Sequence, residues 1–392
     1  MLETPFASWP SFSEDEVDIV ARVIRSNRVN YWTGQEGREF ETEFARWSGS
    51  KYAIALMNGT VALELALRAL DIGPGDEVVV TPRTFIASVS CIVAVGASPV
   101  FADVDRDTQN ITADTIAAVL TPRTRAVICV HLAGMPCDMD PILRLAEERG
   151  LKVIEDCAQA HGARYKGRPV GSIGHVGAWS FCQDKIMSTA GEGGMVTTDD
   201  EVLWNRMWSY KDHGKSFESV YGRAHPPGFR WLHESFGTNW RMLEVQSAVG
   251  RWQLKKLELW SKLRMQHAES IRAAALKTRA LRVPPVPDWA WHANYKCYVF
   301  VEPERLEEGW SRDRIVAEIN ALGVPCYSGS CAEVYRERAF DARSFRPSKR
   351  LMVARELGET SLMFLVHPTL TNAQIERTCE AITTIMFNAA SH

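Results

Sequence analysis

The chain has 392 residues, of which 46% are hydrophobic and 24% charged, and its formal net charge is -3. This balance excludes a nucleic-acid-binding role, because such proteins carry a basic excess that meets the phosphate backbone. No apolar run approaches the about 18 residues that a membrane-spanning helix needs, so no membrane partner is expected. The nine cysteines include no CxxC pair, which predicts reduced thiols, a cytoplasmic protein and no metal site.

The first half of the chain alternates between short apolar runs and helical patterns. Two amphipathic helices are expected first, at residues 13–26 and about 37–47. Strands are then expected at 52–57, 77–80, 99–104, 126–130 and 152–156, with helices near 60–70, 84–95, 112 onward and 140–149. Continuously apolar strands that alternate with helices of about 10–15 residues are typical of βαβ units. The pattern predicts an α/β fold with a mostly parallel sheet flanked by helices.

The second half is more helical. Further strands are expected at 176–181 and 195–196, a long loop at 218–238, and one or two long helices at 242–276. A strand at 297–301 and helices at 311–322 and 372–387 indicate a small α+β unit. Because the chain is long for a single domain, we predict a large domain at residues 1–254 and a smaller C-terminal domain at 255–392.

Lys185 lies in a polar turn between two of the expected strands. The turn follows the apolar run 176–181, and a glycine-rich stretch leads into Met195. A lysine held between buried strands, where glycines let the backbone come close, is placed to form a Schiff base with a carbonyl. A lysine in a turn is otherwise most often a solvated surface residue. The interpretation therefore depends on whether the chain supplies a site around it.

Pyridoxal phosphate (PLP) needs such a lysine, an anion site for its phosphate and a carboxylate at its pyridine nitrogen. Asn58, Gly59 and Thr60 stand between a strand and a helix, where free amides and a hydroxyl can hold phosphate. The alternative for this tripeptide is an ordinary helix N-cap. Asp156 ends a strand and is the candidate for the pyridine nitrogen, the alternative being a solvated strand-end acid.

The cofactor also needs a donor near its phenolic oxygen, a plate over its ring and further phosphate contacts. Gln159, three residues after Asp156, is the candidate donor, and Phe85 is the candidate ring plate. Ser180, on the strand before the lysine turn, is a second candidate for the phosphate. An aromatic residue at a helix start is more often part of the core, and a buried serine hydroxyl is often bonded to backbone.

Six segments together carry a resemblance that covers about residues 5–385. They are Asn58–Leu63, Gly73–Val78, Glu155–Gly162, Ser180–Gly194, Asn239–Met242 and His367–Thr371. With these segments the chain resembles the DegT-type family of PLP-dependent sugar aminotransferases, which are fold-type-I enzymes. The combination of Asp156 and Gln159 with Lys185 and the stretch Glu192–Gly194 is highly specific to that family.

The resemblance implies a role for each candidate residue. Lys185 is the lysine that binds the cofactor and moves the proton. Asp156 pairs with the pyridine nitrogen, Gln159 lies by the phenolic oxygen, and Gly59, Thr60 and Ser180 hold the phosphate. Asn239 is expected to reach the cofactor phosphate of a neighbouring subunit, with Arg241 beside it as a substrate-binding residue. That arrangement implies a homodimer with shared active sites.

The resemblance also implies a reaction. Relatives with histidine in place of Lys185 are dehydratases, so the lysine predicts transamination, and the form Gly191–Glu192–Gly193–Gly194 is similar to that of enzymes acting at sugar C4. We expect an amino group to move from glutamate to a nucleotide-linked keto-sugar, a 4-keto-6-deoxyhexose, for cell-surface polysaccharide such as lipopolysaccharide O-antigen. A keto-cyclitol or 3-keto-sugar acceptor, or a non-catalytic sugar-nucleotide-binding protein, are the alternatives.

Two segments depart from the common family pattern. Cys182–Asp184 differs from the proline, threonine or histidine that many members carry before the lysine. Tyr327–Tyr335 replaces a substrate loop that contains tyrosine and histidine in many relatives. Both departures leave the sugar and its nucleotide open. The histidines in the matching segments, His161, His213 and His367, are expected to be structural more often than catalytic.

Overall fold

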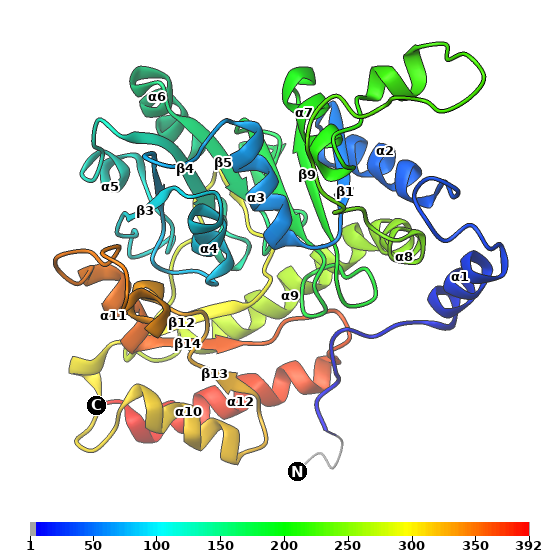
Figure 1. The fold of residues 1–392 in the computed structure, drawn as a ribbon. Coiled ribbons are helices and arrows are strands. Elements are labelled where there is room, and N and C mark those ends of the chain that lie inside the picture. The colour runs from blue at the N-terminus through cyan, green and yellow to red at the C-terminus, as the bar shows by residue number, and fades with distance from the viewer. Residues whose placement is uncertain (1–4, 392) are drawn as a thin grey trace.

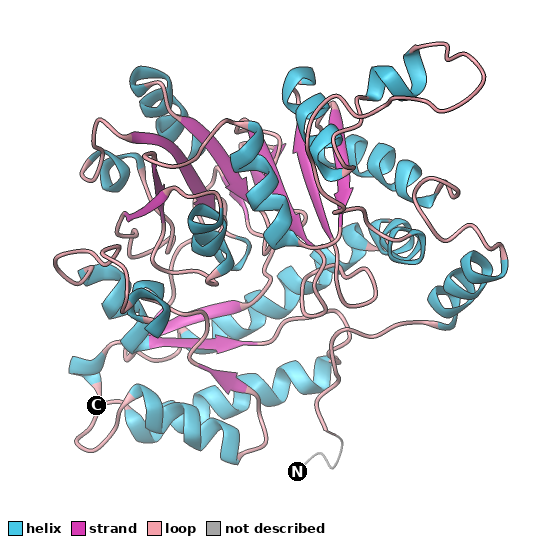
Figure 2. Cartoon of the chain, in the orientation of Figure 1, coloured by secondary structure: helices cyan, strands magenta, loops and turns pink. Residues whose placement is uncertain are grey.

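A seven-stranded sheet forms the centre of the fold within residues 5–391, the part of the chain that the computed structural model describes (Figures 1 and 2). The pairs from β8 to β3 are parallel, and β9 runs antiparallel to both of its neighbours. The predicted mostly parallel sheet is therefore confirmed. In spatial order the strands are β1 (Tyr52–Leu56), β9 (Gly194–Thr198), β8 (Val176–Ser180), β5 (Lys152–Asp156), β4 (Thr124–Val130), β2 (Glu77–Val80) and β3 (Ser98–Phe101).

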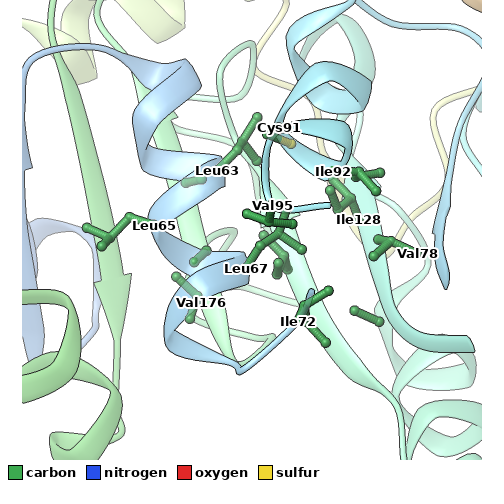
Figure 3. Close-up of a cluster of buried hydrophobic side chains, with 14 of the residues drawn as sticks. Leu63, Leu65, Leu67, Ile72, Val78, Cys91, Ile92, Val95, Ile128 and Val176 are labelled. Atoms are coloured by element: carbon green, nitrogen blue, oxygen red, sulfur yellow. The ribbon is translucent and has the colours of Figure 1, made fainter. Parts of the chain in front are cut away.

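Both faces of this sheet are buried, because successive side chains of a strand point to opposite faces. Val78 and Val80 join one apolar cluster, which Figure 3 shows, whereas Val79 joins another on the opposite face. The first cluster packs under α3 (Gly59–Ala69), α4 (Ala87–Ala94) and α7 (Glu201–Lys211). The opposite face packs against α2 (Glu36–Ser48), α5 (Ala113–Ala117), α6 (Met139–Arg149) and α8 (Glu244–Leu254).

A smaller antiparallel sheet lies below the large one in Figure 1. Its strands, in spatial order, are β10 (Leu281–Arg282), β12 (Cys297–Val301), β14 (Ser361–Phe364) and β13 (Cys326–Tyr327). Around it lie α9 (Leu257–Ala275), α10 (Arg312–Ala321), α11 (Met352–Thr360) and α12 (Asn372–Ala389). The α+β character expected for the C-terminal part is thus present. The exact division of the chain into domains at residue 254 stays a prediction. Residues 1–4 and 392, at the outer ends of the two predicted domains, lie outside the described part.

Two connections tie the smaller sheet to the large one. Strand β11 (Ala290–Trp291) pairs with β6 (Arg164–Tyr165), which in turn pairs with β7 (Arg168–Pro169). At the other end of the chain, Phe6 packs against the core of the smaller sheet before α1 (Glu14–Arg25) begins. The N-terminal segment and β11 therefore both contribute to holding the two parts of the fold together.

Several short elements were not predicted. They include β13, β14, α11 and the 3-10 turns η1 (Leu132–Gly134), η3 (Pro303–Arg305), η4 (Val334–Arg336) and η5 (Arg338–Phe340). The expected loop at 218–238 begins with a π-helical turn, η2 (Glu218–Gly222). Short strands depend on their neighbours more than on their own residues, so a linear pattern does not show them. Among the described residues, no helix combines the length and the apolar character needed to cross a bilayer.

Candidate active site

The carboxyl ends of β1, β5 and β8 meet at one edge of the large sheet, where ligands of α/β proteins bind. β1 is followed by Asn58 and the start of α3, β5 ends at Asp156, and β8 ends at Ser180. A Cβ atom on Gly59 would lie 2.5 Å from the Cβ of Ser180, and one on Gly194 would overlap the carbonyl of Asn58. Glycine at both positions lets the start of α3 lie directly against β8 and β9.

The start of α3 has the features of an anion site. Asn58 caps the helix, because its side-chain oxygen accepts a hydrogen bond from the Val61 amide at 3.0 Å. The amides of Gly59 and Thr60 have no acceptor inside the helix, and the helix dipole adds positive potential there. Ser180 accepts from the Cys182 amide at 3.3 Å and keeps its own proton to donate. These groups fit a phosphate.

Asp156 is a buried carboxylate that two donors hold in place. Ser88 donates its hydroxyl to one carboxylate oxygen at 2.7 Å, and the Ala158 amide donates to the other at 3.1 Å. Burial raises the pKa of Asp156, although these hydrogen bonds and the nearby Lys185 oppose the rise. A cation beside this carboxylate would favour its charged form. The protonated ring nitrogen of PLP is such a cation, so Asp156 fits the predicted role.

Gln159 and Phe85 are both connected to Asp156. Gln159 follows it by three positions, and Phe85 is connected to it through Thr84 and Ser88. The side-chain oxygen of Gln159 accepts from the Ala133 amide at 2.7 Å, so its NH2 group is the part left to donate to a ligand. Phe85 is 67% exposed, although it directly follows Thr84, whose hydroxyl lies 2.8 Å from that of Ser88. A large aromatic ring left exposed beside a buried polar cluster is suited to stack on a flat ligand.

Lys185 lies in a turn that is contacted by Trp9 and by Tyr295, two residues far from it in the sequence. Its backbone carbonyl accepts a hydrogen bond from the indole of Trp9 at 2.7 Å. Its Nζ lies 3.9 Å from a carboxylate oxygen of Asp184 and 5.4 Å from the ring centre of Tyr295. The phenol of Tyr295 donates to Asp184, a residue of the unusual segment before the lysine. The lysine side chain is 15% exposed, so its amine is mostly shielded and still reachable.

Asn239 and Arg241 lie on the segment that leads into α8. Asn239 is exposed and forms a β-bridge with Asp212. Arg241 is paired with Asp212 at 2.7 Å, and Lys215 approaches the same oxygen at 3.2 Å. Within its own chain Arg241 is thus already in an ion pair. A contact of Arg241 with substrate stays a prediction. A contact of Asn239 with the cofactor phosphate of a neighbouring subunit also stays a prediction.

The histidines His161 and His367 are buried near the lysine turn. The His161 ring lies 5.3 Å from the ring of Trp179, and burial with the positive charges of Lys185 and Arg264 lowers its pKa to about 3. His367 bonds to the Thr369 hydroxyl at 2.8 Å and has its pKa lowered to about 3 by burial and Arg264. Both imidazoles are therefore neutral at ordinary pH, which favours the structural role.

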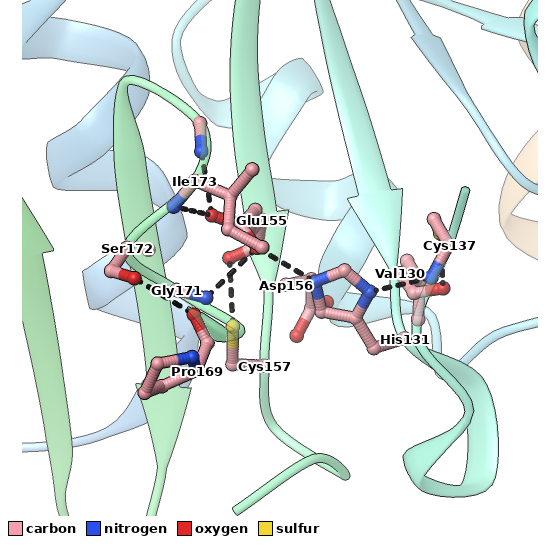
Figure 4. Close-up of polar contacts among 12 residues, drawn as sticks. Val130, His131, Cys137, Glu155, Asp156, Cys157, Pro169, Gly171, Ser172 and Ile173 are labelled. Atoms are coloured by element: carbon pink, nitrogen blue, oxygen red, sulfur yellow. Dashed lines mark hydrogen bonds and ion pairs between the residues drawn. The ribbon is translucent and has the colours of Figure 1, made fainter. Parts of the chain in front are cut away.

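A buried pair of His131 and Glu155, shown in Figure 4, lies next to Asp156, because Glu155 is the residue before it on β5. His131 accepts from the Cys137 amide at its Nδ1, so its Nε2 carries the proton and donates to Glu155 at 3.0 Å. The other partners of Glu155 are the amides of Gly171, Ile173 and Gly174, at 2.7–2.8 Å. Because Glu155 precedes Asp156, this network fixes the end of β5. Nothing in the sequence pairs the two residues.

Cys157 lies close enough to His131 and Glu155 for the three to suggest a metal site. Both nitrogens of His131 are already engaged, and the Glu155 carboxylate accepts four hydrogen bonds. Burial also raises the pKa of the Cys157 thiol well above its ordinary value, whereas a metal binds the thiolate. The cluster is therefore a structural hydrogen-bond network.

Replacing Glu155 with glutamine is expected to destabilise the protein by about 2–4 kcal/mol, because an amide leaves buried donors unpaired. Burial alone would raise the pKa of Glu155, yet the hydrogen bonds and the nearby His131 hold it below its ordinary value. Such a group stabilises the fold above its unfolded pKa, and the gain is lost as the pH falls through the folded pKa. The thermal unfolding temperatures of the parent protein and of Glu155→Gln should therefore differ at neutral pH and converge in acid.

The matched control is Glu258→Gln, since Glu258 is exposed and pairs with Lys262 on its own helix. This variant is expected to unfold like the parent protein. A difference between Glu155→Gln and the parent that stays constant from neutral to acidic pH would contradict the proposed charge state of Glu155.

Known proteins match the chain over nearly its whole length. The sequence model of the DegT/DnrJ/EryC1/StrS aminotransferase family matches residues 10–383. An aminotransferase structure from Psychrobacter cryohalolentis is 62% identical with a TM-score of 0.97, covering 98% of this chain and 99% of that one. The GDP-perosamine synthase of Caulobacter vibrioides is 36% identical over 362 residues, 91% of this chain and 92% of that protein.

A third relative is named for a different activity. The UDP-N-acetyl-3-dehydro-alpha-D-glucosamine 3-aminotransferase of Acidithiobacillus ferrooxidans is 35% identical over 354 residues, covering 90% of this chain and 89% of that protein. The similarity therefore extends to enzymes that are named for different sugars.

Proposed function

Because the chain belongs to the DegT/DnrJ/EryC1/StrS aminotransferase family, we propose that it moves an amino group from glutamate to a nucleotide-linked 4-keto-6-deoxyhexose. The observation that carries the proposal is the meeting of Lys185, Asp156 and the start of α3 at one sheet edge, in a chain that matches sugar aminotransferases over nearly its whole length. Aminotransferases of this family use PLP.

When bound, PLP supplies an electron sink for the carbon that carries the amino group. In the proposed mechanism Lys185 Nζ would serve as the base that takes the proton from that carbon and as the acid that gives it back. Asp156 would keep the ring nitrogen protonated, and the NH2 group of Gln159 would donate to the phenolic oxygen. Phe85 would lie against the ring and exclude water there.

The phosphate is assigned to the groups at the start of α3. The amides of Gly59 and Thr60, the Thr60 hydroxyl and the Ser180 hydroxyl would hold it, and the helix dipole favours its negative charge. A phosphate held there would fix the position of the ring relative to Lys185, which lowers the entropic cost of bringing the amine to the reacting carbon.

The sugar class is supported by the relatives and by one motif. The relatives include proteins named GDP-perosamine synthase. The stretch Gly191–Gly194 is similar to that of enzymes that act at sugar C4, which favours a 4-keto-sugar. A 3-keto-sugar is the second candidate, because one relative of similar identity is named as a 3-aminotransferase. A relative named for spore coat polysaccharide biosynthesis supports a place in cell-surface polysaccharide synthesis.

A homodimer and a cytoplasmic location complete the proposal. Phe229, Trp231 and Phe236 are 76%, 85% and 99% exposed, and they lie on the segment that precedes Asn239. Large apolar rings gathered at a surface favour a protein partner, and a second copy would place Asn239 at the neighbouring site. All nine cysteines are free thiols, which supports a reducing compartment.

The test is an amino-transfer assay with the PLP-loaded enzyme, L-glutamate and a panel of keto-substrates. The panel holds nucleotide-linked 4-keto-6-deoxyhexoses, nucleotide-linked 3-keto-sugars and keto-inositols. The expected result is formation of 2-oxoglutarate and of a 4-amino sugar identified by its mass. Turnover only with a keto-inositol, or no turnover with any substrate while PLP is bound, would overturn the proposal.

A further inference from the structure

Arg83 is a buried cation whose terminal nitrogens have no partner. Its side chain is 0% exposed, and its Nε donates to the side-chain oxygen of Gln109 at 3.1 Å. Both Nη1 and Nη2 are buried without a hydrogen-bond partner among residues 5–391. Leaving a buried guanidinium unpaired is unfavourable, because the charge has lost its water and gained no counter-charge. Such a group indicates an anion that is supplied from elsewhere.

Arg83 lies beside the candidate active site. It follows β2 at the same sheet edge, and the next residue, Thr84, is linked through Ser88 to Asp156. The residue after that is Phe85, the candidate ring plate. An anion on Arg83 would therefore bind close to the reacting centre.

The other side of Arg83 faces the segment 327–335, where this chain departs from its relatives. The guanidinium carbon lies 5.4 Å from the ring centre of Tyr298, and the Tyr298 hydroxyl accepts from the Ser330 amide at 2.9 Å. The Val334 amide donates to the carbonyl of Pro82 at 2.9 Å. The segment thus covers Arg83 and is attached to the residue before it.

The covering segment does not supply the missing negative charge. Its carboxylate, Glu333, is held by Arg350 and by the hydroxyl of Tyr335. Burial lowers the pKa of Arg83, and the groups that oppose this fall are Tyr298 and Cys331, neither of which is a carboxylate. Among residues 5–391, Arg83 is therefore a cation with two free donor groups and no carboxylate against them.

We propose that Arg83 is the receptor for a carboxylate of one of the two substrates, which its Nη1 and Nη2 bind side by side. A planar guanidinium matches a carboxylate in this geometry. Residues 328–332, which contain no helix or strand and of which Ser328 and Cys331 are exposed, shift to admit it. The proposal rests on the proposed function. With a 6-deoxyhexose as acceptor, which has no carboxylate, the carboxylate is that of the amino donor glutamate; an acidic keto-sugar is the other source.

The two sources are separated by measuring the two half-reactions of the PLP-loaded enzyme. The first uses L-glutamate. The second uses matched pairs of nucleotide-linked keto-sugars that carry either a carboxylate or an uncharged group at the same carbon. In Arg83→Met the apparent dissociation constant of the carboxylate-dependent reactant should rise at least about 30-fold, while the other half-reaction changes by less than about 3-fold.

Two variants of Gln109 separate charge from structure. Gln109→Glu places an internal carboxylate beside an intact Arg83, so it should weaken the same half-reaction by competing with the ligand. Gln109→Leu removes the hydrogen bond to Nε without adding a charge, so it should affect that half-reaction much less. The thermal unfolding temperature of each variant is measured in parallel.

The proposal is overturned if Arg83→Met leaves both half-reactions unchanged. It is also overturned if the variant slows both equally and unfolds at a lower temperature, because that result assigns Arg83 to structure alone. Failure of the proposed function is a different result, since the parent enzyme would then transfer no amino group to any nucleotide-linked keto-sugar.

Discussion

Replacing Lys185 with alanine is expected to lower the rate of amino transfer by at least about 10⁴-fold. The variant loses the Lys185 amine, both as the nucleophile for the cofactor and as the group that moves the proton. The rate is measured as release of 2-oxoglutarate from L-glutamate. Visible absorbance from lysine-bound PLP should disappear in the same variant.

The fold should survive this change, so the loss can be assigned to chemistry. The turn is held by backbone contacts, including the hydrogen bond from Trp9 to the Lys185 carbonyl, and these do not depend on the side chain. Lys185→Arg is the matched control, because it keeps a positive charge and removes the nucleophile. Retention of the visible band or of substantial activity in Lys185→Ala would contradict the assigned role.

Replacing Asp156 with asparagine should have two opposite effects. Amino transfer should fall by about 10²–10³-fold, because a neutral amide no longer stabilises the protonated ring nitrogen. The cofactor-free protein should become more stable, because burial raises the pKa of Asp156 and makes the charged carboxylate costly despite the nearby Lys185. The measurements are the turnover rate and thermal unfolding with and without PLP.

The pH dependence of this second effect has a definite sign. An acid whose folded pKa is raised above the unfolded value destabilises the fold once it must ionise, so stability falls as the pH rises through the raised pKa. The cofactor-free parent should show this loss, and Asp156→Asn should not. Ser88→Ala is the control, since it keeps the carboxylate and removes one donor. Equal or lower stability of cofactor-free Asp156→Asn would argue against the account.

The sequence predicted the parts of this site that depend on local pattern. The range 152–156 was expected as a strand and is β5, because a continuously apolar run with a polar end is a strong local pattern. The residues assigned to the cofactor came from their order along the chain and from a family resemblance that the comparisons confirm. The structure adds that Gly59 and Ser180 are in close contact.

Contacts between residues far apart in the sequence were not predictable. Trp9 and Lys185 are 176 positions apart, and no periodicity relates them. The pairing of His131 with Glu155 and the burial of Arg83 likewise depend on how strands and loops are arranged in space. Asp184, which stood out as a departure from the family pattern, gains an explanation only through its bond to the Tyr295 phenol.

The most direct test locates the lysine that binds the cofactor. The PLP-loaded protein is reduced with sodium borohydride, digested and analysed by mass spectrometry for the phosphopyridoxyl group. Lys296 is the nearby competitor, because its Nζ lies 4.8 Å from the ring centre of the same Tyr295 and burial lowers its pKa to about 8. We predict that the label is on Lys185. A label on Lys296, or no labelled lysine in a protein that retains PLP, would contradict the central claim.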